Sequence, residues 1–354
     1  MQVSVISFTK NGLELSKKIE KAFGDWQIKL YTKYKIEGLE NSSSISYVTQ
    51  GISEWAGEQM GQKNALVFIG ACGIAVRAIA SYVKDKLQDS PVLVMDEQGN
   101  YVIPLLSGHI GGANDIANIL AERLQATPVI TTATDVNRRF AVDLFAQKNG
   151  LKIVNKDGIA KISSKILDGK TITVAIEEGH WDGVGIVPEQ IEIVDLDSEI
   201  EKDIVIKTEN EMDKAELILQ PKEYIIGIGC KRGKEEDKLI RWIQKSLEEA
   251  GIFMEQVYAL ASIDRKKDEE GLLRISQRER IPFYTYSAEE LERVTGNLHE
   301  SEFVKKTVGV SNVCERAALY ACGDGGRLVY EKHAEDGMTI AIAKRKWSVA
   351  FDEI

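Results

Sequence analysis

The 354-residue sequence has few cysteines and lacks any long apolar run. Its four cysteines, Cys72, Cys230, Cys314 and Cys322, form no C-x-x-C pair, which argues against a structural zinc site or a disulfide framework and favours free, mostly buried thiols. No stretch approaches the roughly eighteen consecutive apolar residues of a transmembrane helix. The N-terminus starts like a strand and lacks the features of a signal peptide. We therefore expect a cytoplasmic protein that does not insert into membranes.

Positive charge is also scarce. The net charge of −10 argues against a general nucleic-acid binder. Much of it lies between Glu192 and Glu216, where ten acidic residues stand against three lysines. An acidic segment of this kind can coexist with basic pockets elsewhere, and its own role does not follow from the sequence.

Strand and helix patterns alternate at both ends of the chain. Strands are predicted at 3–8, 65–70, 128–135, 256–264 and 282–287, and helices at 13–23, 74–83, 114–125 and 137–145. The apolar segment 91–106 predicts two strands around a turn at 98–100. We predict an α/β fold in which two α/β lobes with largely parallel sheets are joined by a small middle α/β module. The predicted domains are 1–137 (N-terminal α/β domain), 138–221 (middle linker module) and 222–354 (C-terminal α/β domain).

Four glycine-rich turns are predicted where strands end and helices begin, which is the usual ligand edge of a parallel sheet. They are residues 70–73, 108–112, 227–233 and 309–312. Tight packing explains any one of them as well as a ligand does, but four together favour a binding cleft whose amides suit an anion. None matches a nucleotide signature, so NAD and ATP are disfavoured. Lys231 and Arg232 point to an anionic small molecule, while a solvated basic turn explains residues 265–267 equally well.

His109 lies among glycines, which let a ligand approach the backbone. It could be a general base, a metal ligand or a structural hydrogen bonder. Asn114 and Asp115 could cap the helix that follows. Asp135 could cap the helix at 137–145, an interpretation slightly favoured over catalysis, and Glu315 near a helix start is equally ambiguous.

Several stretches together resemble one family. They are "LLSGHIGGANDIAN", "PVITTATD", "GIGCKRGK", "ASIDRKKDEEGL", "YSAEEL" and "GVSNVCERAAL". In this order they resemble the cobalt-precorrin-5A hydrolases (CbiG) of anaerobic cobalamin (vitamin B12) biosynthesis, and the resemblance covers nearly the whole chain. One departure is Ser81 and Ser90, where the family pattern has proline; this affects loop rigidity more than chemistry.

The resemblance implies a substrate and a reaction. The substrate is an anionic, cobalt-containing tetrapyrrole that carries a δ-lactone. Water opens the lactone, and a two-carbon fragment leaves as acetaldehyde to give cobalt-precorrin-5B. No separate cofactor and no metal bound by the protein are expected, because the cobalt belongs to the substrate. A homodimer, and hand-over to other cobalamin-pathway enzymes, remain open.

Lactone opening requires an activated water and a polarised carbonyl group. We hypothesise that His109 activates water or relays a proton, with Asp135 and Glu315 as rival catalytic groups. The predicted substrate-binding residues are Arg77, Ser107, Gly108, Gly111, Gly112, Asn114, Thr131, Thr132, Thr134, Gly229, Cys230, Lys231, Arg232, Gly233, Ser262, Lys267, Ser311 and Asn312. Two alternatives stay open: a corrinoid carrier without catalysis, and an α/β enzyme acting on a phosphorylated small molecule.

Overall fold

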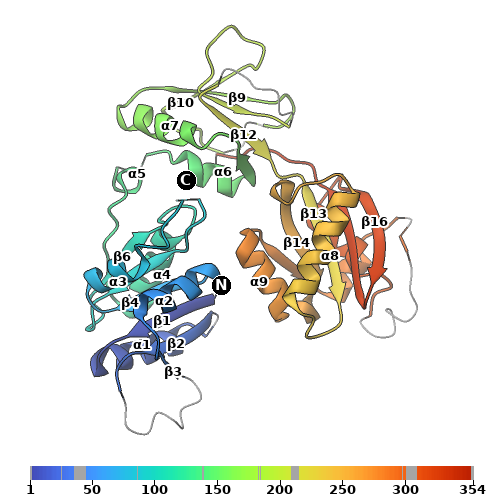
Figure 1. The fold of residues 1–354 in the computed structure, drawn as a ribbon. Helices are drawn as coiled ribbons and strands as arrows, with labels where there is room; N and C mark the ends of the chain where they lie inside the picture. The colour runs from blue at the N-terminus through green and yellow to red at the C-terminus, as the bar shows by residue number, and fades with distance from the viewer. Residues whose placement is uncertain are drawn as a thin grey trace. The chain divides into compact units, whose positions relative to one another are not determined.

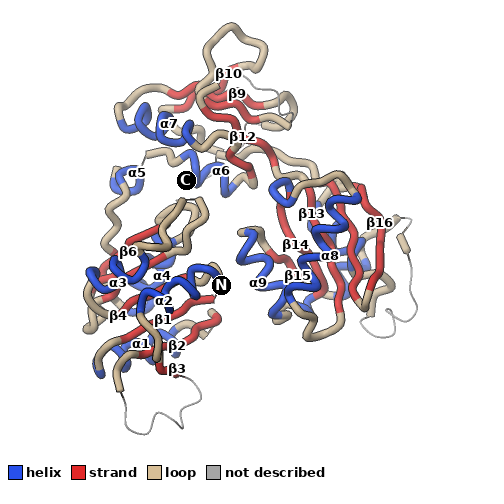
Figure 2. Tube along the Cα trace, in the orientation of Figure 1, coloured by secondary structure: helices blue, strands red, loops and turns tan. Residues whose placement is uncertain are grey.

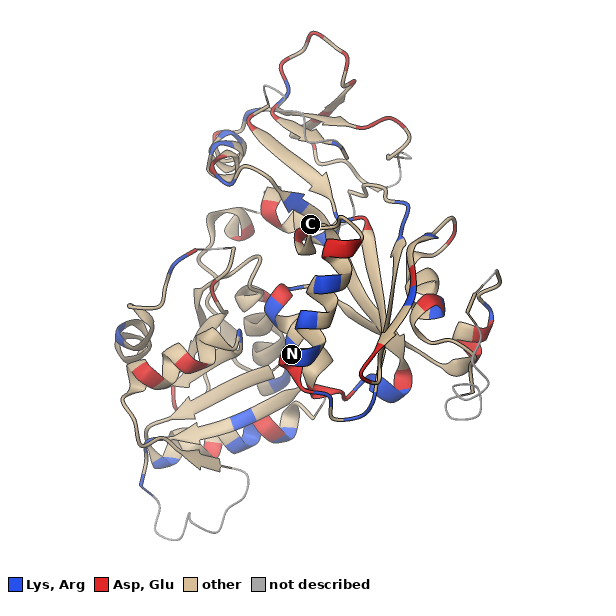
Figure 3. Cartoon of the chain, turned by 45° about the vertical axis from the view of Figure 1, so that its right-hand side comes forward, with Lys and Arg blue, Asp and Glu red and all other residues tan. Residues whose placement is uncertain are grey.

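The computed structural model describes residues 2–24, 26–35, 45–85, 87–137, 139–181, 183, 185–208, 215–296, 298–299 and 309–351. The chain divides into two compact units, Met1–Arg139 and Phe140–Ile354 (Figure 1). Lysine and arginine occur among acidic residues in both units (Figure 3). Among the described residues, no helix is both long and apolar enough to cross a membrane. The domain boundaries predicted near residues 137 and 221 stay predictions.

The first unit is built on a seven-stranded sheet of order β3-β2-β1-β4-β5-β6-β7. Its strands are β1 (Gln2–Ser7), β2 (Gln27–Thr32), β3 (Ile45–Tyr47), β4 (Ala65–Ile69), β5 (Val92–Met95), β6 (Tyr101–Leu106) and β7 (Thr127–Pro128). Its helices are α1 (Lys10–Ala22), α2 (Ile52–Gly61), α3 (Cys72–Ile79), α4 (Ala113–Leu124) and α5 (Ala133–Val136). Side chains alternate along the strands, so α1 and α4 pack on one face and α2 and α3 on the other.

One hairpin reverses the direction of this sheet. All neighbouring strands are parallel except β5 and β6, which form the predicted hairpin. Leu106 at the end of β6 pairs with Val92 at the start of β5, and Val92 in turn pairs with Leu66 near the start of β4. The loop after β6 therefore emerges at the edge opposite to the loop after β4. The expectation that turns 70–73 and 108–112 share one ligand edge is wrong, because the hairpin reverses β6 and sends the loop after it to the other edge.

The second unit contains two sheets (Figure 2). The first has the order β10-β9-β11-β12-β8, with β8 antiparallel to β12. Its elements are α6 (Val142–Lys148), β8 (Leu151–Ile153), α7 (Asp157–Leu167), β9 (Ile172–Ile176), β10 (Ile191–Val194), β11 (Ile204–Ile206) and β12 (Leu217–Pro221). The acidic segment supplies β10 and β11, and its residues 209–214 lie outside the described residues.

The other sheet of this unit has the order β15-β14-β13-β17-β16, with β13, β14 and β15 parallel and β16 and β17 forming an antiparallel pair. Its strands are β13 (Tyr224–Cys230), β14 (Val257–Ile263), β15 (Phe283–Tyr286), β16 (Arg327–Glu335) and β17 (Met338–Lys344). Its helical segments are α8 (Glu236–Glu249), η2 (Met254–Gln256), η3 (Asp264–Lys266), α9 (Glu270–Glu279), α10 (Ala288–Glu292) and α12 (Cys314–Cys322). Helices α8 and α9 pack on one face and α12 on the other.

The mixed α/β architecture with largely parallel sheets is confirmed, but some predicted elements are wrong. Strand β7 ends at Pro128, and Thr134 and Asp135 belong to α5 rather than to the end of a strand. Helix α6 begins at Val142, so Asp135 does not cap it. Ser287 caps α10, accepting a hydrogen bond from the N–H of Glu290 at 3.2 Å.

Turn 227–233 is shorter than predicted, because Gly227 and Gly229 lie within β13. A Cβ atom on Gly227 would lie 1.8 Å from the carbonyl oxygen of Cys314, so this glycine allows α12 to cross β13 closely. Turn 309–312 precedes α12, and the nearest described element before it is α10, not a strand.

Candidate active site

The loop that carries His109 connects β6 to α4 and is tightly packed on itself. Gly112, the N-cap residue of α4, has a φ angle of +82°, in the left-handed region that favours glycine. A Cβ atom on Gly111 would lie 2.3 Å from Cβ of Ser107, so a side chain there would displace the loop. Ser107 itself donates a 2.8 Å hydrogen bond from its hydroxyl to the carbonyl oxygen of Asp89. The glycines therefore serve close packing within the loop, and not only access for a ligand.

His109 is paired with Asp135. Nε2 of His109 lies 2.6 Å from Oδ2 of Asp135, and their side chains are 13% and 34% exposed. The hydroxyl oxygen of Thr134 lies 3.3 Å from the same ring nitrogen. An ionised carboxylate only accepts hydrogen bonds, so in the neutral ring Nε2 carries the proton and Nδ1 is the basic nitrogen. This is the arrangement in which a carboxylate orients a histidine for proton transfer.

The parallel pairing of β6 and β7 brings these two residues together. Both strands run in the same direction, so the loop after β6 and the segment after β7 leave the sheet at one edge. His109 comes from the first segment and Asp135 from the second. Sequence reasoning singled out both residues but did not predict their pairing.

Asn114 completes this cluster. Its Nδ2 donates to Oδ2 of Asp135 at 3.1 Å and to the hydroxyl of Thr132 at 3.2 Å. The side chain is buried, and its Oδ1 makes no hydrogen bond with any residue that the structure describes. Asn114 and Asp115 lie inside α4, so neither is its N-cap residue. Asn114 instead fixes the position of the Asp135 carboxylate.

Most of the amides at the start of α4 are already used by the loop itself. The N–H of Gly112 bonds to the carbonyl of His109 at 2.8 Å, and those of Ala113 and Asn114 bond to the carbonyls of Ser107 and Gly108 at 3.0 Å. Gly112 therefore does not offer its amide to an anion in this structure, contrary to expectation. Among the described residues, the N–H groups of Gly108 and Gly111 make no hydrogen bond.

Two predicted substrate-binding residues of this unit, Arg77 and Thr131, do not take part in the hydrogen bonds of this cluster. Arg77 is exposed on α3, and its Nη1 donates to the carbonyl of Gly73 at 3.1 Å, beside the loop after β4. That loop is at the opposite sheet edge from His109. Thr131 precedes α5 and is exposed.

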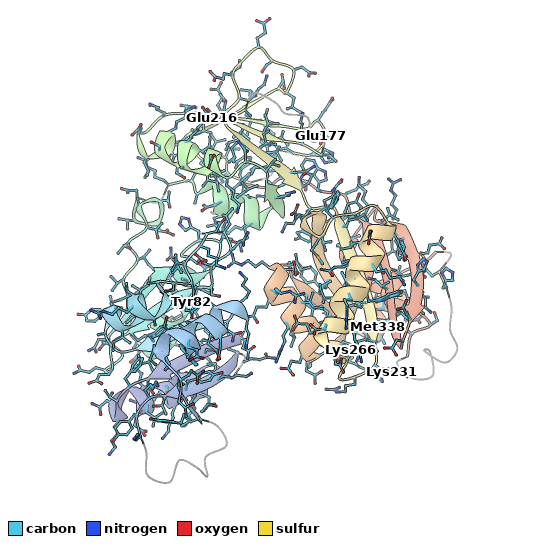
Figure 4. The ribbon with its side chains drawn as sticks, in the orientation of Figure 1. Tyr82, Glu177, Glu216, Lys231, Lys266 and Met338 are labelled. Carbon is cyan, nitrogen blue, oxygen red and sulfur yellow. The ribbon has the colours of Figure 1, made fainter. Side chains whose placement is uncertain are left out.

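A second candidate site lies in the other unit, at the end of the C-terminal sheet. A cavity of about 630 Å³ opens where β13 and β14 end and β17 begins. Figure 4 shows Lys231, Lys266 and Met338 at this end of the sheet. The cavity lies at the carboxyl edge of the parallel strands β13 and β14, beside the start of the antiparallel strand β17, and the carboxyl edge of parallel strands is the usual ligand edge of such a sheet. The volume falls in the range of roughly 300–1,000 Å³ typical of small-molecule sites.

Part of the predicted binding set lines this cavity: Gly229, Cys230, Lys231, Arg232 and Asn312. The others do not line it and have different surroundings. Gly233 donates its N–H to Glu269 at 2.7 Å, buried Ser262 donates to the carbonyl of Ile228 at 2.6 Å, and Lys267 is exposed. Buried Ser311 accepts a 3.5 Å contact from Arg316.

Sequence reasoning missed other lining residues, among them Lys266, Lys332, Met338 and Thr339. Lys266 ends η3, which follows β14, and for residues 265–267 the sequence favours a solvated basic turn and an anion site equally. Lys332 lies on β16, and only the antiparallel pairing of β16 and β17 brings it to this edge. Burial raises the pKa of the Cys230 thiol, so this lining group is neutral.

Glu315 lies behind the cavity with no exposed surface. Its carboxylate accepts hydrogen bonds from the N–H groups of His299 and Lys332 at 2.9 and 2.8 Å, from Nδ1 of His299 at 2.9 Å, and from Asn312. Burial alone would raise the pKa of this carboxyl, but the hydrogen bonds outweigh burial and lower it. Glu315 thus holds two segments that flank the cavity, and a catalytic role for it stays a prediction.

Among the described residues, no group of three or more His, Cys, Asp and Glu side chains is arranged to hold a metal ion. The side chains of His109 and Asp135 are suited to proton transfer, and the lysines of the cavity are suited to binding anions. An α/β fold with a paired histidine and aspartate and a lysine-lined cavity at the carboxyl edge of a sheet is typical of an enzyme.

Three family models match the chain: cobalamin synthesis G N-terminal at residues 54–135, cobalamin biosynthesis central region at 140–219, and cobalamin synthesis G C-terminus at 224–343. A cobalt-precorrin-5A hydrolase of Priestia megaterium is 31% identical over 96% of this chain and 94% of its own length. The one of Salmonella typhimurium is 33% identical over 96% of this chain and 97% of its own. The chain belongs to the CbiG family of cobalamin biosynthesis proteins, which confirms the resemblance noted in its motifs.

A solved structure of the same kind is also similar. The crystal structure of a cobalamin biosynthesis protein G homolog from Sulfolobus solfataricus matches 98% of this chain and 97% of its own, with 24% identity and a TM-score of 0.40.

Proposed function

We propose that this chain is a cobalt-precorrin-5A hydrolase, which opens the δ-lactone of the cobalt-bound macrocycle with water and releases acetaldehyde to give cobalt-precorrin-5B. Its support is the similarity over nearly the whole length to two proteins of that name. The single structural observation that carries the proposal is the 2.6 Å pairing of His109 Nε2 with Asp135 Oδ2 in a partly exposed loop.

The chemistry needs proton transfers that such a pair can perform. The oxygen of water adds to the lactone carbonyl carbon while its proton passes to the imidazole, and the lactone C–O bond breaks to leave a carboxylate and an alcohol. Removal of the alcohol proton then releases acetaldehyde as the carbon–carbon bond breaks, and the electron pair stays on the macrocycle. His109 serves as acid and base in turn, and Asp135 stabilises the imidazolium that forms between the steps.

The remaining predicted residues have supporting roles in this proposal. The amides of Gly108 and Gly111 are placed beside His109 and suit an anionic oxygen of the lactone or of a side-chain carboxylate. Thr132 and Thr134 supply hydroxyls to the same cluster. The cobalt enters and leaves as part of the substrate, and we propose no separate cofactor. A homodimer and hand-over of the product to another cobalamin-pathway enzyme stay hypotheses.

The test is anaerobic incubation of the full chain with cobalt-precorrin-5A, with acetaldehyde and the macrocyclic product measured together. We expect one acetaldehyde for each lactone opened, with water consumed in the same ratio. The matched control is substrate whose lactone has been opened beforehand, which separates hydrolysis from fragmentation. Binding of the macrocycle without acetaldehyde release would favour a corrinoid carrier and would overturn the proposal.

A further inference from the structure

The cavity of the C-terminal sheet is lined by more cations than acids. Four cations and two acids line it: Lys231, Arg232, Lys266, Lys332, Glu335 and Asp336. Both acids are neutralised by lysines that do not line the cavity, since Glu335 lies 2.9 Å from Lys245 and Asp336 lies 2.6 Å from Lys234. Neither acid therefore forms an ion pair with a cation of the lining, although Lys231, after Lys234, also helps to lower the pKa of Asp336.

Two of the four cations are paired elsewhere. Lys266 lies 2.8 Å from the buried carboxylate of Glu269, and Arg232 bonds to Asp268. Lys231 and Lys332 form no ion pair with any residue that the structure describes. They approach the cavity from different elements, Lys231 from the loop after β13 and Lys332 from β16. The cavity therefore presents two lysines from separate elements that no ion pair among the described residues takes up, with Asp336 as a weaker electrostatic neighbour of Lys231.

Both lysines are held in place through their backbone. The N–H of Lys231 donates to the carbonyl of Gly337 at 3.0 Å, and a Cβ atom on Gly337 would lie 2.9 Å from Cδ of Lys231, so the lysine stem packs over this glycine. The N–H of Lys332 donates to Glu315 at 2.8 Å. Positioning of this kind lowers the entropy lost when a lysine binds a ligand.

The walls between these charges are largely apolar, formed by Ile263, Val313, Ala334 and Met338. A ligand that fits must therefore present apolar surface together with two separated anionic groups. The edge of a tetrapyrrole, with ring methyl groups between acetate and propionate side chains, has this character.

Phosphate chemistry fits less well, because the amides that a phosphate would use are occupied. The N–H groups of Gly233 and Lys234 donate to Oε1 of Glu269 at 2.7 and 3.2 Å. Glu236 and Asp237 in the first turn of α8 add negative charge at the helix start. An incoming phosphate would meet like charge at the position where it normally binds a helix N-terminus.

We infer that this cavity binds one edge of the tetrapyrrole substrate, with Lys231 and Lys332 each pairing with a peripheral carboxylate and the apolar wall contacting the ring edge between them. The inference rests on the proposed function for the identity of the ligand. It adds Lys332 and the apolar wall to the binding residues, and it assigns the cavity to substrate binding rather than to proton transfer.

The experiment is a fluorescence titration of the full chain with uroporphyrin III, a porphyrin that carries acetate and propionate side chains. Wild type is compared with Lys231→Gln, Lys332→Gln and the double variant, and the matched control is Lys238→Gln, an exposed lysine of α8 that does not line the cavity. We expect each cavity substitution to weaken binding about tenfold, since each removes one charge-assisted contact, and Lys238→Gln to leave it unchanged. Equal binding by the double variant and wild type would overturn the inference. So would a tighter affinity of the cavity for ATP than for uroporphyrin III, measured by competition.

Turnover separates this inference from the proposed activity. In acetaldehyde release, the double variant should raise KM and leave kcat near the wild-type value, because the lysines contact the substrate equally before and during the reaction. Normal KM in the double variant, with acetaldehyde still released, would remove the cavity from the binding site and leave the hydrolase proposal intact. Lysine-dependent porphyrin binding without any acetaldehyde release from wild type would do the reverse.

Discussion

The loop that carries His109 and the lysine-lined cavity lie at similar places in two sheets but present different kinds of side chains. Each lies where parallel strands end and helices begin, the first beside β6 and β7 and the second beside β13 and β14. The first brings a histidine and an aspartate within 2.6 Å, and the second presents two lysines without ion-pair partners among the described residues. The first arrangement can move a proton, whereas the second can only hold an anion.

In both regions, backbone N–H groups at the start of a helix donate to acceptors within the protein. In the first, carbonyls of the loop accept from Gly112, Ala113 and Asn114. In the second, the carboxylate of Glu269 accepts from Gly233 and Lys234. Internal acceptors thus take most of the amides that a glycine-rich turn usually offers a ligand, which leaves side chains as the main polar groups available in both regions.

The largest expected effect is that of His109→Ala. Removal of the imidazole should lower kcat for acetaldehyde release by about 10³-fold, because general acid–base catalysis contributes that much, and leave uroporphyrin III binding measurable. The matched control is His333→Ala, an exposed histidine of β16 whose ring stacks on Tyr330. Near-normal turnover in His109→Ala would assign proton transfer to another residue and remove the contrast between the two regions.

Asp135→Asn should have the next largest effect. The amide keeps the size of the side chain but removes the charge that stabilises an imidazolium, so kcat should fall about 10²-fold while KM changes little. Asp115→Asn, an exposed residue in the first turn of α4, is the control for loss of a nearby negative charge. If both variants lost activity equally, the loss would come from the lower negative charge of the region and not from the lost pairing with His109.

The sequence predicted much of the fold because local patterns determine it. Short apolar segments predicted strands such as β1, β4 and β14, and the turn at 98–100 predicted the hairpin of β5 and β6. What it did not predict was the consequence of that hairpin. Once β6 runs against β5, the segment after β7 meets His109 at the edge opposite to the loop after β4.

The cavity shows a different limit. Lys231 belongs to a glycine turn after a strand, a pattern that signals a binding loop, and it was predicted. Lys332 lies in a strand whose sequence signals only alternation, and its position at the cavity depends on the pairing of β16 with β17 and of β17 with β13, a strand far earlier in the chain. Likewise, the carboxylate of Glu269 accepts hydrogen bonds from the N–H groups of residues 233 and 234. Glu269 lies at the start of another helix, and no local sequence pattern predicts this contact.

Asn114→Ala tests whether the first region depends on exact placement of its carboxylate. The variant loses the donor to Asp135 and to Thr132, so we expect kcat to fall about tenfold with KM nearly unchanged, because one hydrogen bond that orients the carboxylate is lost. Asn118→Ala, on the exposed side of the same helix, is the matched control. A parallel loss of stability and activity, with the kcat of the folded fraction unchanged, would reduce Asn114 to a structural role.

The smallest expected effect on turnover is that of Glu315→Gln, which tests the support of the second region. Glutamine cannot accept all the hydrogen bonds that the buried carboxylate accepts, so the free energy of unfolding at pH 7 should fall by about 2–3 kcal/mol, while kcat per folded molecule stays near normal. The folded-state pKa of Glu315 is lowered from 4.5, so the stabilisation by its carboxylate is complete well above that pH and is lost as pH falls through the folded-state pKa. Urea unfolding of both proteins should show a stability difference that is largest at neutral pH and shrinks in acid, whereas Glu331→Gln, an exposed residue of β16, should show no such difference. A difference independent of pH would mean that packing, and not the ionised carboxylate, holds the segments around the cavity.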